Sequence, residues 1–249
     1  MTENSTFSAI ESSAIDSAET KLHRFAGILV MLTPVFFIAG IVSAVTQVPF
    51  DGASDVDVVT SPGWLLFWSA FTAGFVGFAA GAAIVLRQRF SGTTGAILGT
   101  LPLLQIPLSF VSIVAGWFVS RAIVRTDTTV AVPPAQQALV LDVMEAITDG
   151  LAFTTGLLFG FVLLALGYLY IQEPGRRSVA GYLGILLGTI TFLVNLGLLL
   201  AAEATDLWIL GILMSVLASF VLVPIGWFVY CDSDRIGHAG DSSSGTPSE

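Results

Sequence analysis

The residues best suited to chemistry form a short acidic cluster. Asp142, Glu145 and Asp149 stand three and four residues apart, directly ahead of an apolar run that ends at residue 171. Residues at this spacing share one face of an α-helix, where three carboxylates could bind a cation or pair with arginines. Counting back from Arg176 at about 1.5 Å per residue uses up a membrane span near residue 151. We therefore expect the acids just outside the membrane, on a helical extension of that span.

Two arginines supply the matching charge. Arg121 and Arg125 stand one turn apart at the expected outer end of the preceding apolar run. At the same rise per residue they reach the heights of Asp149 and Glu145. We predict an antiparallel helical hairpin in which Arg121 pairs with Asp149, and Arg125 with Glu145 or Asp142. The outer surface stays acidic even so, which would either attract cations or reflect adaptation to high salt.

Polar groups inside the apolar runs are neutral. Gln105 falls near the middle of the third run, between two prolines, and Asn195 lies toward the outer third of the fifth. Such side chains usually form hydrogen bonds between helices. The alternative is that they contact a small uncharged ligand. Both remain candidate intramembrane polar contacts.

Several kinds of chemistry lack the residues they need. We find no Asp, Glu, Lys, Arg or His at hydrocarbon depth, and both histidines, His23 and His238, fall at expected cytoplasmic ends. An intramembrane proton relay usually needs such a group. Cys231 is the one cysteine, so a paired-cysteine redox centre cannot form. The sequence predicts no metal site, no cofactor and no catalytic residues, and a protein that is not an enzyme.

The composition explains which elements carry these residues. Of 249 residues 55% are hydrophobic and 11% charged, and the apolar residues gather in runs of about 20, enough to cross a hydrocarbon layer of roughly 30 Å. We predict an all-α polytopic membrane bundle with a transmembrane domain over residues 21–236. Acidic residues 1–20 are expected to be disordered or to form a short surface helix, and residues 237–249 to be disordered. The six predicted spans are 25–45, 64–86, 95–119, 151–171, 179–201 and 207–229.

Basic residues orient the predicted bundle. Lys and Arg near span ends are retained on the cytoplasmic side, and seven of the nine fall on one side of a six-span chain. Both termini are therefore expected in the cytoplasm of a multi-pass protein of the cell membrane. The seven residues are Lys21, Arg24, Arg87, Arg89, Arg176, Arg177 and Arg235.

Small residues recur at helical spacing within the spans. Such ladders let helix backbones approach closely, and we expect them to pack helices within the bundle, against another membrane protein or against a second copy of the chain. Pro34, Pro102, Pro107 and Pro224 are expected to bend their spans or to frame a cavity. The ladders comprise Ser69, Ala73, Gly77 and Gly81, then Gly156 with Gly160, and Gly184 with Gly188.

The net charge of −9 comes with one Lys against eight Arg. An acidic, Lys-poor surface is typical of proteins from high-salt cytoplasm, which favours a haloarchaeal origin, and no basic patch suggests nucleic-acid binding.

The phasing of the spans, with the phrase "GRRSVAGYLGILLG" at 175–188, resembles the six-span membrane proteins of haloarchaea and bacteria that are described only as domains of unknown function. The resemblance implies the fold and no activity. Two hypotheses follow: a bundle that binds or transports a small neutral or lipid-like molecule, or a non-catalytic scaffold for other membrane proteins.

Overall fold

The apolar runs fold into helices, because inside a membrane each backbone N–H and C=O group must be bonded within its own segment. The computed structural model of the chain describes residues 3–48, 57–58, 61–119, 134–201 and 208–239. Within these ranges it contains helices and no strand, and six stretches are long and apolar enough to cross a membrane. The predicted all-α, six-helix membrane architecture is confirmed. Spans 1 to 6 are Ser17–Gln47, Pro62–Arg89, Gly92–Phe118, Asp142–Ile171, Arg176–Leu200 and Ile209–Ser233.

Four spans are continuous helices: α1 (Glu3–Gln47), α3 (Pro62–Arg89), α7 (Pro134–Ile171) and α8 (Arg176–Leu200). The backbone N–H of Trp64 donates to Ser61 Oγ at the start of α3, an N-cap that fixes where this helix begins. Helix α1 reaches back to Glu3, so much of the segment expected to be disordered or a short surface helix is part of one long helix. The physical reason is that neither Gly nor Pro interrupts it before Gly27.

Spans 3 and 6 are broken. Span 3 consists of α4 (Gly92–Thr100), the 3₁₀ turn η1 (Leu101–Leu104), α5 (Gln105–Ile113) and the π-helical η2 (Val114–Val119). Span 6 consists of α9 (Trp208–Ser219) and α10 (Leu222–Ala239). Pro102, Pro107 and Pro224 lie at or beside these breaks, where each removes a backbone donor. Pro34 lies inside uninterrupted α1.

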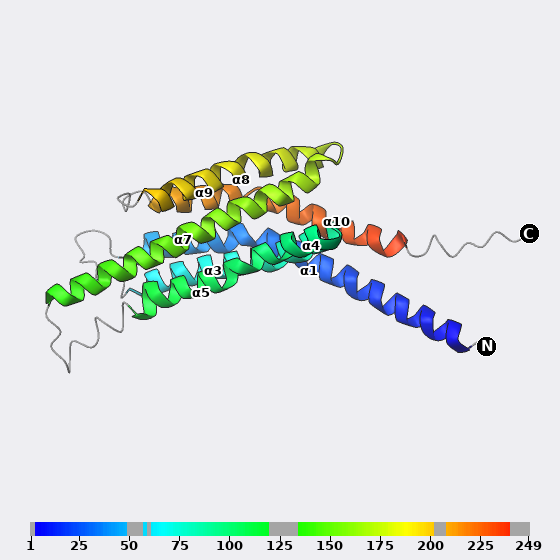
Figure 1. The fold of residues 1–249 in the computed structure, drawn as a ribbon, viewed down its shortest axis with the longest axis horizontal. Helices are drawn as coiled ribbons and strands as arrows, with labels where there is room; N and C mark the ends of the chain where they lie inside the picture. The colour runs from blue at the N-terminus through cyan, green and yellow to red at the C-terminus, as the bar shows by residue number, and fades with distance from the viewer. Residues whose placement is uncertain (1–2, 49–56, 59–60, 120–133, 202–207, 240–249) are drawn as a thin grey trace, which may run out of the picture.

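The spans alternate in direction, so their ends gather at two ends of the bundle (Figure 1). We call one the basic end, where spans 1, 3 and 5 begin and where Arg24, Arg89 and Arg177 lie. We call the other the far end, where spans 1, 3 and 5 finish. Helix α7 extends beyond its neighbours at the far end (Figure 1), as the long helix predicted there requires.

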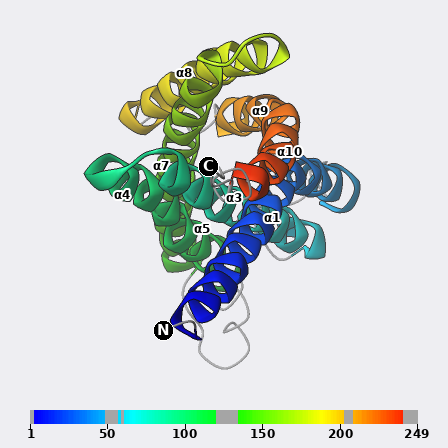
Figure 2. The same cartoon turned by 90° about the vertical axis from the view of Figure 1, so that its right-hand side faces the viewer.

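In chain order the six spans form two groups of three. The most extensive helix contacts are α7 with α8 and α1 with α3, which are the first two spans of each group, and the next is α1 with α10, which joins the two groups. Span 3 packs against α3 and α7, while span 6 packs mainly against α1 through α10 and less against α8 through α9. Seen from the basic end, α1 and α8 lie on opposite sides of the bundle (Figure 2). We call spans 1–3 and 4–6 the two halves; because each has three spans, they run in opposite directions.

Glycines make the helix contacts within the halves close. A Cβ on Gly160 would lie 2.8 Å from the carbonyl oxygen of Gly188, and one on Gly81 would lie 2.8 Å from that of Ala26. Gly184 faces α7, and Gly77 faces α1. The face of α3 that carries Gly77 and Gly81 is therefore occupied by α1, and is not open to another membrane protein.

Aromatic rings fill the centre of the bundle. Phe37 stacks on Phe71 with ring centroids 4.7 Å apart, and Phe159 packs against Phe75 and Phe78 at 5.6 and 4.7 Å. This cluster ties spans 1, 2 and 4 together, and two of its rings also form a wall of the pocket described next.

Candidate binding pocket

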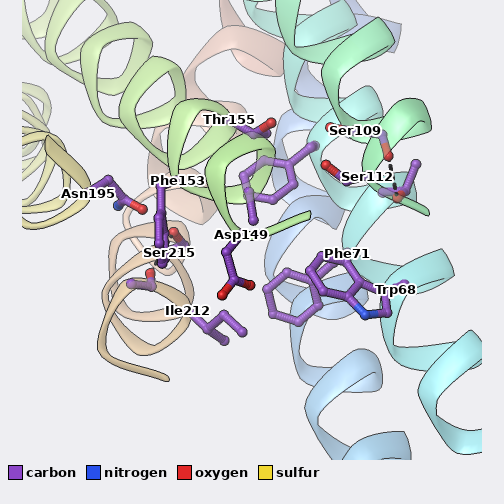
Figure 3. A pocket seen from close by; sticks show the side chains of 14 residues that line it. Trp68, Phe71, Ser109, Ser112, Asp149, Phe153, Thr155, Asn195, Ile212 and Ser215 are labelled. Carbon is purple, nitrogen blue, oxygen red and sulfur yellow. Dashed lines mark hydrogen bonds between the residues drawn. The ribbon is translucent and has the colours of Figure 1, made fainter. Parts of the chain in front are cut away.

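A partly open pocket lies among five helices, α3, α5, α7, α8 and α9 (Figure 3). Along the bundle it is closer to the far end than to the basic end. Its empty volume, with the part open to the surroundings, is about 590 Å³, and about 50 Å³ is available to the centres of water-sized molecules. One water needs about 10–15 Å³ in the latter measure, so a few waters or a solute of similar size fit. The walls are formed by Trp68, Phe71, Thr72, Phe75, Ser109, Ser112, Asp149, Ala152, Phe153, Thr155, Asn195, Gly211, Ile212 and Ser215.

Asn195 is one of the two predicted polar contacts, and the structure places it on the pocket wall. It is 2% exposed, and its Nδ2 donates to the carbonyl oxygen of Thr191 at 2.8 Å. Its side chain lies against Gly156 of α7 and Gly211 of α9. This hydrogen bond lies within α8 and does not link two helices, although the side chain packs between helices and lines the pocket. Contact of Asn195 with a ligand stays a prediction.

Gln105, the other predicted contact, is fully buried next to the pocket rather than in its wall. Within the described part of the chain neither its Oε1 nor its Nε2 has a hydrogen-bond partner. Ser109 and Ser112 follow it by four and seven residues on the same face of α5, and both line the pocket. Polar side chains thus run along α5 from Gln105 into the pocket. The unpaired amide of Gln105 is the kind of group to which an ordered water or a ligand forms hydrogen bonds.

Asp149 lies on the helical extension that we expected, within α7, and its place outside the membrane stays a prediction. The structure adds neighbours that the sequence did not predict, because Asp149 is half-buried and lines the pocket, with its carboxylate near Ile212 and Phe71 (Figure 3). The reason is that α9 and α3 rise to the same height as this part of α7 and enclose it. Counting residues along one helix predicts how far along the bundle axis a side chain lies, but it does not predict which other helices lie beside it.

The predicted ion pairs of the outer hairpin are only partly within the described residues. Arg121 and Arg125 lie outside them, as does the side chain of Glu145, while Asp142 is exposed. The pairing with Asp149 therefore stays a prediction.

A buried ionic cluster lies at the basic end, and sequence analysis missed it. Asp232 of α10 is 3% exposed and accepts from Arg89 Nη2 at 2.5 Å and from Arg177 at 2.6 and 3.1 Å. Arg177 also donates to Glu173 at 2.6 Å. We expected no ionisable group at hydrocarbon depth, and the sixth predicted span ends at residue 229. The structure continues α10 to Ala239 and buries Asp232 between the two arginines.

Further polar contacts join the helices at this end. His23, expected at a cytoplasmic end of a span, is fully buried with Nδ1 2.6 Å from Gln88 Oε1, and Arg24 Nε donates to Ser233 Oγ at 3.0 Å. Beside them α1 and α10 touch at Gly27 and Gly226. The signal that could have revealed this region is the gathering of oppositely charged residues at one height: Asp232 follows an apolar run whose end must meet Arg89 and Arg177.

Neither region resembles a metal centre. Among the residues that the structure describes, no three His, Cys, Asp or Glu side chains come together as metal ligands would. What the pocket offers chemically is a small space with aromatic walls and buried neutral polar groups, plus one carboxylate. This arrangement is typical of a binding site for a small molecule.

Comparison with protein-family models, curated proteins and solved structures finds no match to this chain.

Proposed function

We propose that this protein carries a small neutral molecule across the cell membrane and that the pocket is its binding site. The observation that carries the proposal is the pocket itself, in which Thr155, Asn195 and Ser215 are each at most 3% exposed yet face a shared space between helices. Buried polar groups around a small space favour a solute over an acyl chain. Of the two ligand classes considered, small neutral molecules fit better than lipid-like ones.

The two halves support transport rather than binding alone. Many transporters consist of two halves of opposite direction, with interrupted helices at corresponding positions around the binding site. Here the third span of each half is broken, and both broken spans contribute to the pocket, through Ser109 and Ser112 in one and Ser215 in the other.

The basic end provides a closed gate in this proposal. Arg89 belongs to the first half and Asp232 to the second, so their contact joins the halves. Arg24 and Ser233 make a second contact between the halves. The pocket would then open toward the far end while these contacts close the basic end, and transport would require them to separate.

The membrane and the orientation belong to the same proposal. The gathering of Lys and Arg at the basic end supports a cytoplasmic location for both termini. The acidic, Lys-poor composition supports a haloarchaeal protein that works in high salt.

Cysteine labelling from each side of the membrane tests this function. Replacing Cys231 with Ser removes the one native thiol, and Ala152→Cys then places a thiol in the half-buried pocket wall. A membrane-impermeant methanethiosulfonate is expected to label the thiol from the far-end side and not from the basic-end side. A thiol that is labelled from neither side would refute an open pocket.

Weakening the gate should change this pattern. In the same background Asp232→Asn is expected to allow labelling from the basic end as well. Glu173→Gln is the matched control, because Glu173 binds the same Arg177 but both residues belong to the second half. A second variant, Arg24→Gln, tests the other contact between halves if Asp232→Asn does not fold. Unchanged labelling in both folded gate variants contradicts the gate.

A further inference from the structure

We infer that the pocket selects small neutral molecules that donate hydrogen bonds, such as primary amides, over molecules that only accept them. This inference names the ligand class and rests on the proposed function of the pocket. The inference follows from the hydrogen bonds that the pocket's own polar groups already donate within the protein.

Three hydroxyl groups of the pocket have used their protons within their own helices. Thr155 donates to the carbonyl oxygen of Leu151 at 2.8 Å, Ser215 to that of Gly211 at 2.9 Å, and Ser112 to that of Leu108 at 3.0 Å. A hydroxyl has one proton and two acceptor lone pairs. Because a carbonyl oxygen can only accept, each of these hydroxyls retains only acceptor capacity.

Two more groups of the wall follow the same pattern. Thr72 donates to the carbonyl oxygen of Ser109 at 3.4 Å, and Asn195 uses one Nδ2 proton on the carbonyl oxygen of Thr191. The Oδ1 atom of Asn195 is an acceptor. All five groups are more than nine-tenths buried, so bulk water has little access to their free lone pairs.

Fewer donors remain. Within the described residues the Ser109 hydroxyl and the indole Nε1 of Trp68 lack partners, and Asn195 has a second Nδ2 proton. A primary amide matches this distribution, because its carbonyl oxygen can accept from Ser109 while its two N–H groups bind the more numerous acceptors. Its flat faces suit the rings of Phe71 and Phe153.

The deeper groups favour a neutral ligand. Asp149 is the one charged side chain among the described wall residues, and the groups beyond it are neutral. Moving a cation past Asp149 onto hydroxyl oxygens would sacrifice much of its hydration. An amide avoids this cost and still satisfies the acceptors.

Ligand-observed saturation-transfer NMR on the full-length protein in lipid nanodiscs tests the inference. The matched pair is acetamide and N,N-dimethylacetamide, which share the carbonyl oxygen and differ in the N–H donors. Acetamide is expected to bind about 5- to 150-fold more tightly, as the loss of two hydrogen bonds predicts. Methylammonium serves as the cationic comparison, and it is expected to bind more weakly than acetamide.

Variants locate the binding. Thr155→Val removes one acceptor and keeps the shape, and is expected to weaken acetamide binding about 2- to 12-fold. Ser215→Ala is a second variant with the same expectation. Thr189→Val is the matched control, because Thr189 makes the same 2.8 Å bond to a carbonyl oxygen four residues back but does not line the pocket.

Each outcome separates this inference from the proposed function. Equal affinity for the two amides, tighter binding of methylammonium, or an equal effect of Thr189→Val overturns the ligand class. If the Ala152→Cys thiol is labelled from the far-end side while amide selectivity is absent, the ligand class fails and the carrier stands. If the selectivity is present but neither gate variant changes the labelling pattern, the gate fails and the ligand class stands.

Discussion

Replacing Asp232 with Asn is expected to lower the free energy of unfolding far more than the loss of an exposed ion pair would. The Asp232 side chain is 5% exposed and accepts two hydrogen bonds from Arg177 and one from Arg89. Removing one partner of a buried ion pair costs about 3–5 kcal/mol, because the other charges remain buried without compensation. Since Arg89 is 36% exposed and can turn toward water, we expect the lower end, about 3 kcal/mol.

The assay is thermal unfolding of the purified protein in detergent, with Glu173→Gln as the control. About 3 kcal/mol corresponds to a melting temperature lower by about 6–12 °C in a chain of this size. Glu173 is 29% exposed and binds Arg177 one turn away, so its loss should cost at most about 1 kcal/mol. If Asp232→Asn costs no more than Glu173→Gln, the ionic cluster does not hold the basic end together and our reasoning about it is wrong.

Three further predictions concern packing, burial and charge. Gly160→Ala should destabilise by about 1–3 kcal/mol in the same assay, because its Cβ would lie 2.6 Å from the backbone of α8. Gly197→Ala, which meets nothing within 4 Å, should be neutral or slightly stabilising; equal effects would contradict the close packing. Gln105→Leu should slow solute uptake into proteoliposomes, because it removes the unpaired amide at the end of the polar side chains that run along α5 into the pocket, and uptake at the native rate would exclude a role of this amide in binding the solute. For Arg121 and Asp149 we predict a coupling energy of at most about 1 kcal/mol in a double-mutant cycle, smaller in high salt, and a larger value would mean a buried pair.

The helices could be predicted from the sequence because their cause is local. Runs of about 20 apolar residues must become helices in a membrane, and the basic residues at alternate loops predict which span ends share a side. The long helix that carries Asp149 was predicted for the same reason, since neither Gly nor Pro interrupts residues 135–149. The prolines were less informative, because Pro34 leaves α1 intact whereas span 3 is broken beside Pro102.

The candidate site could be predicted only in part. Gln105 and Asn195 were recognised as polar residues inside spans, and both lie in or next to the pocket. The hydroxyls that accompany them carry no sequence signal, because threonines and serines that bond to their own helix occur inside and outside the pocket alike, as Thr155 and Thr189 do. Which of them face a shared space depends on helix rotation and pairing, and those are long-range properties.

The ionic cluster was missed for a related reason. Asp232 lies past the end of an apolar run, where hydropathy alone predicts a solvated residue, yet the continuation of α10 buries it against Arg89 and Arg177. Its burial is determined by three helices from both halves. A sequence pattern within one helix cannot contain that information.

The most direct test of the central claim is the labelling rate of the Ala152→Cys thiol from the two sides of the membrane, in the Cys231→Ser background. The proposed carrier predicts fast labelling from the far-end side and little labelling from the basic-end side, and the amide ligand class predicts that acetamide slows the fast labelling. Equal rates from both sides would contradict a gated binding pocket in this bundle, whereas a rate that acetamide leaves unchanged would contradict only the ligand class.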